Sequence, residues 1–208
     1  FDYTRDTVWR GFEASLKRLQ RDKVDLLQIH ESEQAGWEGI FGKGRTLEAL
    51  LEIQEQGLTQ HIGLTGSDLV LMRDVLQASD VFVSAITFCK YDLLVQTAKE
   101  ILVPTAAERD VAVICASPLH AGLLGSKRDL WIERDRFADL FEKLERVGNL
   151  LADQPEEIAR IALRYLLSDA RVSILLSGVA TVEELEVSVA VSDGQYLSAE
   201  LVEQIEGV

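Results

Sequence analysis

The junction SILLSGVATVEEL has the residue types of a phosphate-binding site. An apolar run ends in Ser177-Gly178, and Thr181 with Glu184 three residues later forms the pattern of a capping box, which starts a helix. Small residues at this point would let a phosphate approach the backbone N–H groups at the positive end of that helix. The alternative is an ordinary turn, because any connection from a strand to a helix needs a small residue and a cap.

The segment ASPLHAGLLG, residues 116 to 125, is a second candidate for ligand binding. Ser117 and two glycines, Gly122 and Gly125, follow an apolar run, and the segment is longer than a tight turn requires. Such a segment can fold over a ligand, and binding residues are often found on loops of this kind. The alternative is an ordinary surface loop.

His30 ends the apolar run VDLLQIH and is the candidate catalytic residue. A single histidine at the end of a strand is also a common hydrogen-bonded residue of the rim, and Glu31 and Glu33 could either hold its ring or solvate the loop. His61 precedes its own apolar run, and neither it nor His120 stands at metal-ligand spacing from His30. The histidines therefore predict no metal site.

Helical and strand patterns alternate along the chain and would position these residues. Apolar residues recur at helical spacing after Thr4, a candidate N-cap, and Gly57 suits the left-handed position that ends a helix. We expect helices near residues 8–19, 47–56, 69–77, 95–109 and 155–165, the last with Pro155 at its first position. We expect strands at residues 24–30, 61–66, 81–89, 111–119 and 172–178.

Strands that are apolar on both faces and alternate with amphipathic helices predict an α/β fold, with a parallel sheet covered by helices. Both a doubly wound sheet and a (β/α)8 TIM barrel fit this pattern. Polar residues lie at the carboxyl end of every expected strand, which favours the barrel, because a doubly wound sheet binds its ligand mainly at one switch point. Five strands cannot close a barrel. We therefore expect residues 1–208 to form a single incomplete barrel domain with roughly the last five βα units, and three further strands before Phe1.

The composition narrows the choice of partners. The net charge is −14 and Lys and Arg are scattered singly, which argues against nucleic acid and anionic membranes as partners. Cys89 and Cys115 form neither a zinc-binding pattern nor a disulfide framework, so we expect a reducing cytoplasm. The sequence lacks an apolar stretch near the ~20 residues needed to span a bilayer. An oligomer is compatible with these features.

Four runs of the sequence, taken in order, resemble the aldo-keto reductase family. They are FDYTRDTVWRGFEASLKRLQRDKVDLLQIH, ALLEIQEQGLTQHIGLTG, CASPLHAGLLG and SGVATVEELEVSVA. Within the family, they are most similar to the dehydrogenases that oxidise L-fucose, D-threo-aldoses or L-galactose, and to pyridoxal 4-dehydrogenase. The resemblance implies transfer of a hydride between a nicotinamide cofactor and a carbonyl or lactol carbon. It also implies an aldose or an aldehyde as the small-molecule substrate.

The resemblance assigns one catalytic residue. The family uses a tyrosine as proton donor or acceptor, assisted by lysine, aspartate and histidine, because a tyrosine with its ordinary pKa near ~10 needs a nearby cation. Only the histidine has a counterpart here, His30, whose imidazole would hydrogen-bond and orient the substrate oxygen. Tyr3 and Tyr91 do not match the tyrosine. We expect the other three residues before Phe1, and we expect this chain alone to be inactive. The alternative is a non-catalytic binding module of the same fold.

The resemblance also assigns residues to the cofactor. The nicotinamide carboxamide would lie at Thr65 and Gly66, and the pyrophosphate at Ser117, Leu119 and Gly122. Gly178 and Thr181 match the family positions at the start of the helix that faces the cofactor phosphates. We also expect Glu184, the capping partner of Thr181, to belong to the cofactor site.

Four positions depart from the family pattern: Phe88, Ala116, Val187 and Ser188. The family often has a glutamine, an aromatic shelf and a Glu-Asn pair there, which contact the carboxamide, the nicotinamide ring and adenine. Residues 177–190 contain no Lys or Arg but include three glutamates, Glu183, Glu184 and Glu186. A 2′-phosphate without a cation beside these carboxylates would be costly, so we expect NAD to be preferred over NADP.

Overall fold

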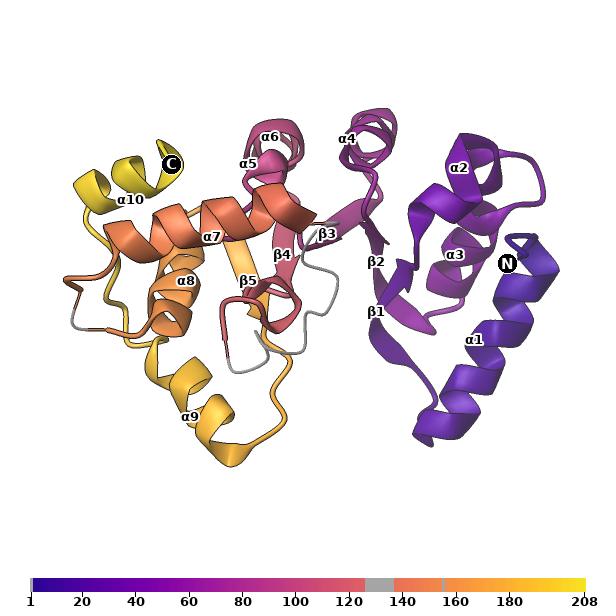
Figure 1. Cartoon of the computed structure of the whole chain (residues 1–208). Coiled ribbons are helices and arrows are strands. Elements are labelled where there is room, and N and C mark those ends of the chain that lie inside the picture. Colours follow the sequence, from indigo (N-terminus) through magenta and orange to yellow (C-terminus); the bar gives the residue numbers. More distant parts are fainter. Residues whose placement is uncertain (1, 126–136, 155) are drawn as a thin grey trace. The chain divides into compact units, whose positions relative to one another are not determined.

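The structure is a computed structural model that describes residues 2–125, 137–154 and 156–208. Strands and helices alternate along most of the chain (Figure 1). The strands are β1 (Val24–Ile29), β2 (Thr59–Gly66), β3 (Phe82–Phe88), β4 (Ala112–Ala116) and β5 (Val172–Leu176). The helices are α1 (Arg5–Leu19), α2 (Ser32–Phe41), α3 (Thr46–Glu55), α4 (Leu69–Ala78), α5 (Thr97–Ile101), α6 (Val103–Glu108), the 3-10 helix η1 (His120–Gly122), α7 (Ala138–Leu150), α8 (Ile158–Leu167), α9 (Val182–Ala190) and α10 (Ala199–Glu206).

The chain divides into two compact units. The first consists of Phe1–Thr87 and Ile101–Val113, and the second of Phe88–Glu100 and Ile114–Val208. The described strands neighbour one another in chain order, from β1 to β5, and β4 begins in the first unit and ends in the second. This order without reversal is what successive right-handed βα units produce.

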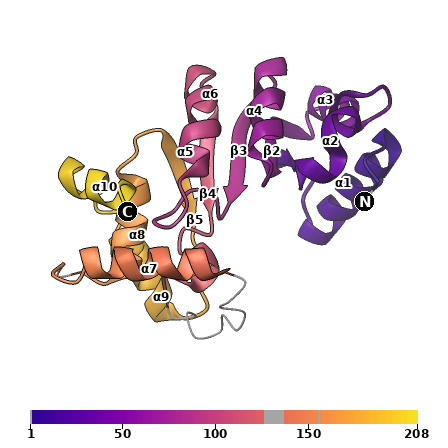
Figure 2. The same ribbon diagram turned by 45° about the horizontal axis from the view of Figure 1, so that its top comes forward.

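In the first unit, β1, β2 and β3 run parallel, with Leu27 opposite Ile62 and Leu64 opposite Ala85. The β2 side chains Ile62 and Leu64 are fully buried, as is Met72 of α4. Helices α3 and α4 both contact β2, and α4 and α6 lie side by side in both views (Figures 1 and 2). The apolar faces of these helices thus cover the central strand of the unit.

Gly63 marks the tightest approach between these strands. Gln28 of β1 donates a hydrogen bond from Nε2 to Ser84 Oγ of β3 at 3.2 Å, directly across β2. A Cβ added at Gly63 would lie 2.4 Å from Ser84 Oγ and 2.9 Å from Gln28 Nε2. Only glycine therefore allows the polar contact between β1 and β3 to pass over β2.

A partly buried polar network joins Tyr91, Asp169 and Arg171 in the second unit. Tyr91, in the loop after β3, donates its hydroxyl to Asp169 Oδ2 at 2.7 Å, and Arg171 donates two hydrogen bonds to the same carboxylate at 2.8 and 2.7 Å. Burial opposes ionisation of Asp169, but the hydrogen bonds from Arg171 and Tyr91 outweigh burial and lower its pKa from 3.8 to about 2. The network fixes the turn between α8 and β5 against the loop after β3.

Apolar side chains are exposed on the two outer strands and on α9. Leu26 of β1 is exposed, as are Ile174 and Leu176 of β5. Helix α9 contains no buried residue, and its Val182 and Val189 are exposed. An amphipathic helix normally buries its apolar stripe, so these surfaces are unusual for a folded chain. Among the residues that the structure describes, no helix is both long enough and apolar enough to cross a membrane.

The predicted elements agree with the structure in type and order, but one strand and one helix differ in extent. The strand expected over residues 111–119 ends at Ala116, because Ser117 has a positive φ that turns the chain. The single helix expected over residues 95–109 is wrong: it is two helices, α5 and α6, interrupted at Leu102. Pro104 explains the break, because it has no N–H and its ring would clash with the carbonyl of Glu100 in a continuous helix. Helix α8 begins at Ile158, and Pro155 lies outside the described residues. Helices α2, α7 and α10 were not predicted.

Candidate functional site

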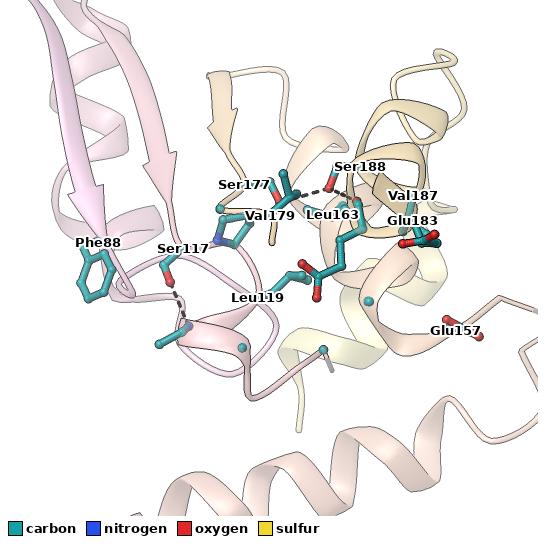
Figure 3. A pocket seen from close by; sticks show the side chains of 17 residues that line it. Phe88, Ser117, Leu119, Glu157, Leu163, Ser177, Val179, Glu183, Val187 and Ser188 are labelled. Carbon is teal, nitrogen blue, oxygen red and sulfur yellow. Dashed lines mark hydrogen bonds between the residues drawn. The ribbon is translucent and has the colours of Figure 1, made fainter. Parts of the chain in front are cut away.

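A pocket of about 430 Å³ lies in the second unit (Figure 3). Its walls come from the end of β3, the loop between β4 and η1, the start of α8 and the connection from β5 to α9. The lining includes Ser117, Leu119, Gly122, Gly178 and Glu184, five residues that the sequence predicts as cofactor-binding. Thr181, a sixth, does not line the pocket but caps the adjoining helix. The two candidate segments of the sequence thus form one concave site.

The loop after β4 has a strained backbone. Ser117, His120 and Ala121 all have positive φ, at 60°, 48° and 51°, a conformation that costs a non-glycine residue on the order of 1 kcal/mol. Ser117 Oγ accepts a hydrogen bond from the N–H of Ala121 at 2.8 Å, drawn in Figure 3. Gly122, with φ 91°, completes the turn where a side chain would be disfavoured. The loop therefore holds a defined shape against the pocket.

The N-cap predicted at Thr181, at the start of α9, is confirmed, whereas the N–H that Glu184 accepts belongs to Ala180, one residue before that N-cap. Thr181 Oγ1 accepts from the N–H of Glu184 at 3.2 Å, and Glu184 Oε2 accepts from the N–H of Ala180 at 2.7 Å. Gly178 has open space where a Cβ would stand, so a ligand can approach its backbone closely. The Glu184 carboxylate thus lies beside this helix end, where it accepts from the N–H that precedes the N-cap. A phosphate would have to share the helix end with that carboxylate.

The pocket has acidic groups at its edge. Glu157, Glu183 and Glu184 all line it, and no Lys or Arg is among its described lining residues. Arg160 lies beside it, in a smaller pocket that shares Glu157 and Val187 with the larger one. Glu157 and Arg160 come from α8 and its cap, a part of the sequence that the prediction of a cofactor site did not include.

Of the positions that depart from the family pattern, three line the pocket: Phe88, Val187 and Ser188. Phe88 is 55% exposed, so it offers an open aromatic face. Ser188 lies within hydrogen-bonding distance of Ser177, 3.1 Å between the two Oγ atoms, and donates to the carbonyl of Glu184 at 3.0 Å (Figure 3). Ala116 is not among the lining residues.

His30 lies in the first unit, directly after β1, with its side chain 80% exposed. Its Nδ1 is 3.9 Å from Glu31 Oε2, so Glu31 is the nearby carboxylate. Glu33 is engaged elsewhere, because its carboxylate accepts from the N–H and the hydroxyl of Ser67 at 3.2 and 2.6 Å. Glu33 therefore does not hold the His30 ring, and Glu31 lies near it beyond hydrogen-bonding distance.

Tyr3 holds the backbone beneath His30, a role that sequence reasoning missed. Its hydroxyl lies 3.2 Å from the carbonyl oxygens of both His30 and Glu31. Glu31 itself has φ 49°, and the contact with Tyr3 helps to hold this left-handed residue. No local pattern in the sequence signals this contact, because Tyr3 and His30 are 27 residues apart.

Thr65 and Gly66 end β2, the strand beside β1. Thr65 Oγ1 donates to the carbonyl of Ile29 at 2.9 Å, next to His30. A Cβ at Gly66 would lie 2.5 Å from Ser32 Oγ and 2.7 Å from Glu33 Oε2, so the glycine is required by close packing. Ser32 Oγ is buried without a hydrogen-bond partner. The ends of β1 and β2 therefore place His30, Thr65 and Gly66 within one unit.

Comparison with known proteins identifies a family. The profile described as "Aldo/keto reductase family" matches residues 1–208. L-galactose dehydrogenase of Arabidopsis thaliana is 30% identical in an alignment of 196 positions that covers 91% of this chain and 59% of the relative. Pyridoxal 4-dehydrogenase of Microbacterium luteolum is 26% identical in an alignment of 200 positions that covers 91% of this chain and 58% of the relative. The chain thus spans less than two thirds of the length of either relative.

The fold agrees with a solved structure. The holo form of aldo-keto reductase AKR11C1 from Bacillus halodurans superposes with a TM-score of 0.82 at 24% identity, covering 100% of this chain and 68% of that one. At this identity the likeness shows the fold alone. The predicted fold class, an α/β chain that carries part of a (β/α)8 barrel, is confirmed, as is the resemblance to the sugar dehydrogenases and pyridoxal 4-dehydrogenase.

Proposed function

Because the chain belongs to the aldo/keto reductase family, we propose that it forms the cofactor pocket and the substrate-orienting part of an NAD-dependent oxidoreductase. Its reaction is the oxidation of an aldose at C1, or the interconversion of a related aldehyde and alcohol. The names of the relatives support this substrate class, since one is an L-galactose dehydrogenase and another a pyridoxal 4-dehydrogenase. Free thiols at Cys89 and Cys115 support a reducing cytoplasm as its place of action.

The pocket of the second unit is the observation that carries this proposal. Ser117, Leu119 and Gly122 line one wall, and Gly178, which has open space at its Cβ position, lines the other, so a pyrophosphate can approach the backbone on both sides. Phe88 presents its exposed ring to a planar group of the ligand. When bound, a nicotinamide dinucleotide supplies or accepts the hydride. The chain's own residues bind and orient that cofactor.

His30 is the residue that we propose to orient the substrate oxygen. Its imidazole is exposed at the end of β1, and Tyr3 and Thr65 fix the backbone on either side of it. An imidazole N–H donated to a carbonyl or lactol oxygen would position the carbon that exchanges a hydride. The tyrosine, lysine and aspartate of the family have no counterpart in residues 1–208. We therefore expect no turnover of an aldose by these residues alone, and measured turnover with NAD would contradict this.

We expect NAD to bind more tightly than NADP, because Glu157, Glu183 and Glu184 line the pocket and would repel a 2′-phosphate. Titration calorimetry of the chain with each dinucleotide tests this. If NADP bound more than about tenfold more tightly than NAD, a difference of ~1.4 kcal/mol in binding free energy, the argument from the glutamates would be rejected. Arg160 would then be the group that binds the 2′-phosphate.

A matched pair of variants sharpens the test. Glu183→Lys places a cation at the pocket and should narrow the preference for NAD, whereas Glu186→Lys makes the same change at a position outside the pocket lining and should leave it unaltered. Equal effects of the two variants would show that overall charge, and not the pocket, sets the preference.

A non-catalytic dinucleotide-binding module is the second candidate. One observation favours it. Of the four catalytic residues of the family, the tyrosine, the lysine and the aspartate have no counterpart at matching positions of residues 1–208. Kinetic assays with a panel of aldoses and pyridoxal separate the candidates, using the chain joined to any residues that precede it. Binding of NAD without turnover of any substrate in that form would support the module. Turnover that falls on replacing His30 with alanine would support the enzyme.

A further inference from the structure

His120 lies in the middle of the loop that lines the pocket, but it points away from the pocket. Leu119, Ala121 and Gly122 all line the cavity, whereas His120 does not and is only 7% exposed. The His120 side chain therefore lies in the interior of the second unit, although its neighbours in the loop face the pocket.

The partner of His120 in the interior is Asp92. Nδ1 of His120 lies 2.7 Å from Oδ2 of Asp92, and since a carboxylate only accepts, the Nδ1–H donates. Asp92 is completely buried and is itself held, because its Oδ1 accepts from the N–H groups of Leu94 and Val95 at 2.8 and 3.0 Å. The carboxylate is thus a fixed point to which the loop is attached.

The attachment supports a backbone that would otherwise relax. His120 and Ala121 have positive φ, and such residues keep that conformation only where surrounding contacts enforce it. The loop's own hydrogen bonds depend on the position of His120: its N–H donates to the carbonyl of Ser117 at 2.9 Å, and its carbonyl accepts from the N–H of Leu123 at 3.0 Å. The contact of the ring with Asp92 favours the backbone position of His120 in which both of these hydrogen bonds form.

We propose that His120 is a positioning residue, which holds the loop at residues 117–125 in its ligand-binding shape through the hydrogen bond to Asp92. The identity of the ligand rests on the proposed function, whereas the restraint on the loop does not. The loop is preorganised, so a dinucleotide does not have to order it on binding.

Two substitutions of His120 distinguish the effect of its hydrogen bond to Asp92 from the effect of its volume in the interior. His120→Asn keeps an N–H donor near the position of Nδ1 and tolerates positive φ, whereas His120→Leu fills the site without a donor. We expect His120→Leu to weaken binding of NAD and of ADP-ribose about tenfold, equivalent to ~1.4 kcal/mol, and His120→Asn to restore most of it. His61→Leu, the same change at an exposed histidine, is the control and should bind as the wild type does. Titration calorimetry measures all four proteins.

Amide hydrogen exchange tests the restraint without a ligand. In the wild type, the amides of Leu123 and Leu124 should exchange as slowly as the buried amides of α8, and His120→Leu should accelerate them while leaving α8 unchanged. Fast local exchange of these amides in the wild type would overturn the proposal even if His120→Leu does not fold. Equal binding by the Leu and Asn variants would also overturn it. If the wild type binds neither NAD nor ADP-ribose, the proposed function fails, and the exchange data still decide the role of His120.

Discussion

Replacing Asp169 by asparagine should destabilise the protein at neutral pH and about half as much near pH 3. The variant keeps the shape of the side chain but loses the charge that receives two hydrogen bonds from Arg171 and one from Tyr91. These contacts lower the pKa of Asp169 from 3.8 to about 2 in spite of burial.

The size of the effect follows from that change in pKa. A tenfold change in an acid dissociation constant corresponds to about 1.4 kcal/mol, so the fall from 3.8 to about 2 corresponds to ~2.5 kcal/mol. Screening by water at the edge of the site reduces this to about 1 to 2 kcal/mol. Because the pKa is lower in the folded state, the stabilisation is complete above about pH 4 and is lost as the pH falls toward 2, with roughly half gone at pH 3.

Urea unfolding followed by circular dichroism measures this effect at about pH 7 and about pH 3. Asp169→Asn should lower the free energy of unfolding by about 1 to 2 kcal/mol at the higher pH and by roughly half as much at the lower one. Asp153→Asn, at an exposed aspartate of the same unit, is the control and should have little effect at either pH. An equal cost of Asp169→Asn at both pH values would refute the assignment of the low pKa to this network.

Three further outcomes are expected. Asp68→Ala removes the side chain that accepts from the N–H groups of Val70 and Leu71 at the start of α4, and should cost about 1 kcal/mol in urea unfolding. Tyr3→Phe should speed amide exchange at Gln34, whose N–H donates to the Glu31 carbonyl, roughly fivefold, equivalent to ~1 kcal/mol, and unchanged exchange would remove Tyr3 from this role. Burial raises the pKa of the Cys89 thiol and raises that of Cys115 to about 12, so both should react slowly with a disulfide reagent until denaturant is added, and rapid reaction of the native protein would contradict this.

The sequence predicts the order of elements because each has a clear period. Alternating apolar runs and helical repeats identify the five strands, and Gly57, with φ 72°, takes the left-handed position expected after α3. The Thr181 and Glu184 pair is equally local, since the two residues are three apart and both hydrogen bonds form within one turn. Features that depend on a few neighbouring residues were therefore predictable.

Features that interrupt a local period, or that depend on distant residues, were not predictable. Helix α2 was missed because it contains Gly36, which has φ 61° and ψ 179° and interrupts the helical backbone. The contact of Tyr3 with the carbonyl of His30 joins residues 27 apart, and the pair of Asp92 and His120 joins residues 28 apart. Single-sequence patterns carry no signal for such pairs, because the partners meet only when the chain has folded.

The division of the chain into Phe1–Thr87 with Ile101–Val113, and Phe88–Glu100 with Ile114–Val208, has a consequence for its synthesis. A ribosome releases residues 88–100, which belong to the second unit, before the segment that completes the first. The first unit therefore cannot finish folding until α6 and the start of β4 have emerged. At that time residues 88–100 have been synthesised, but the rest of the second unit, from residue 114 on, has not. Because the residues of the two units alternate along the chain, no single cut in the gene separates one unit from the other.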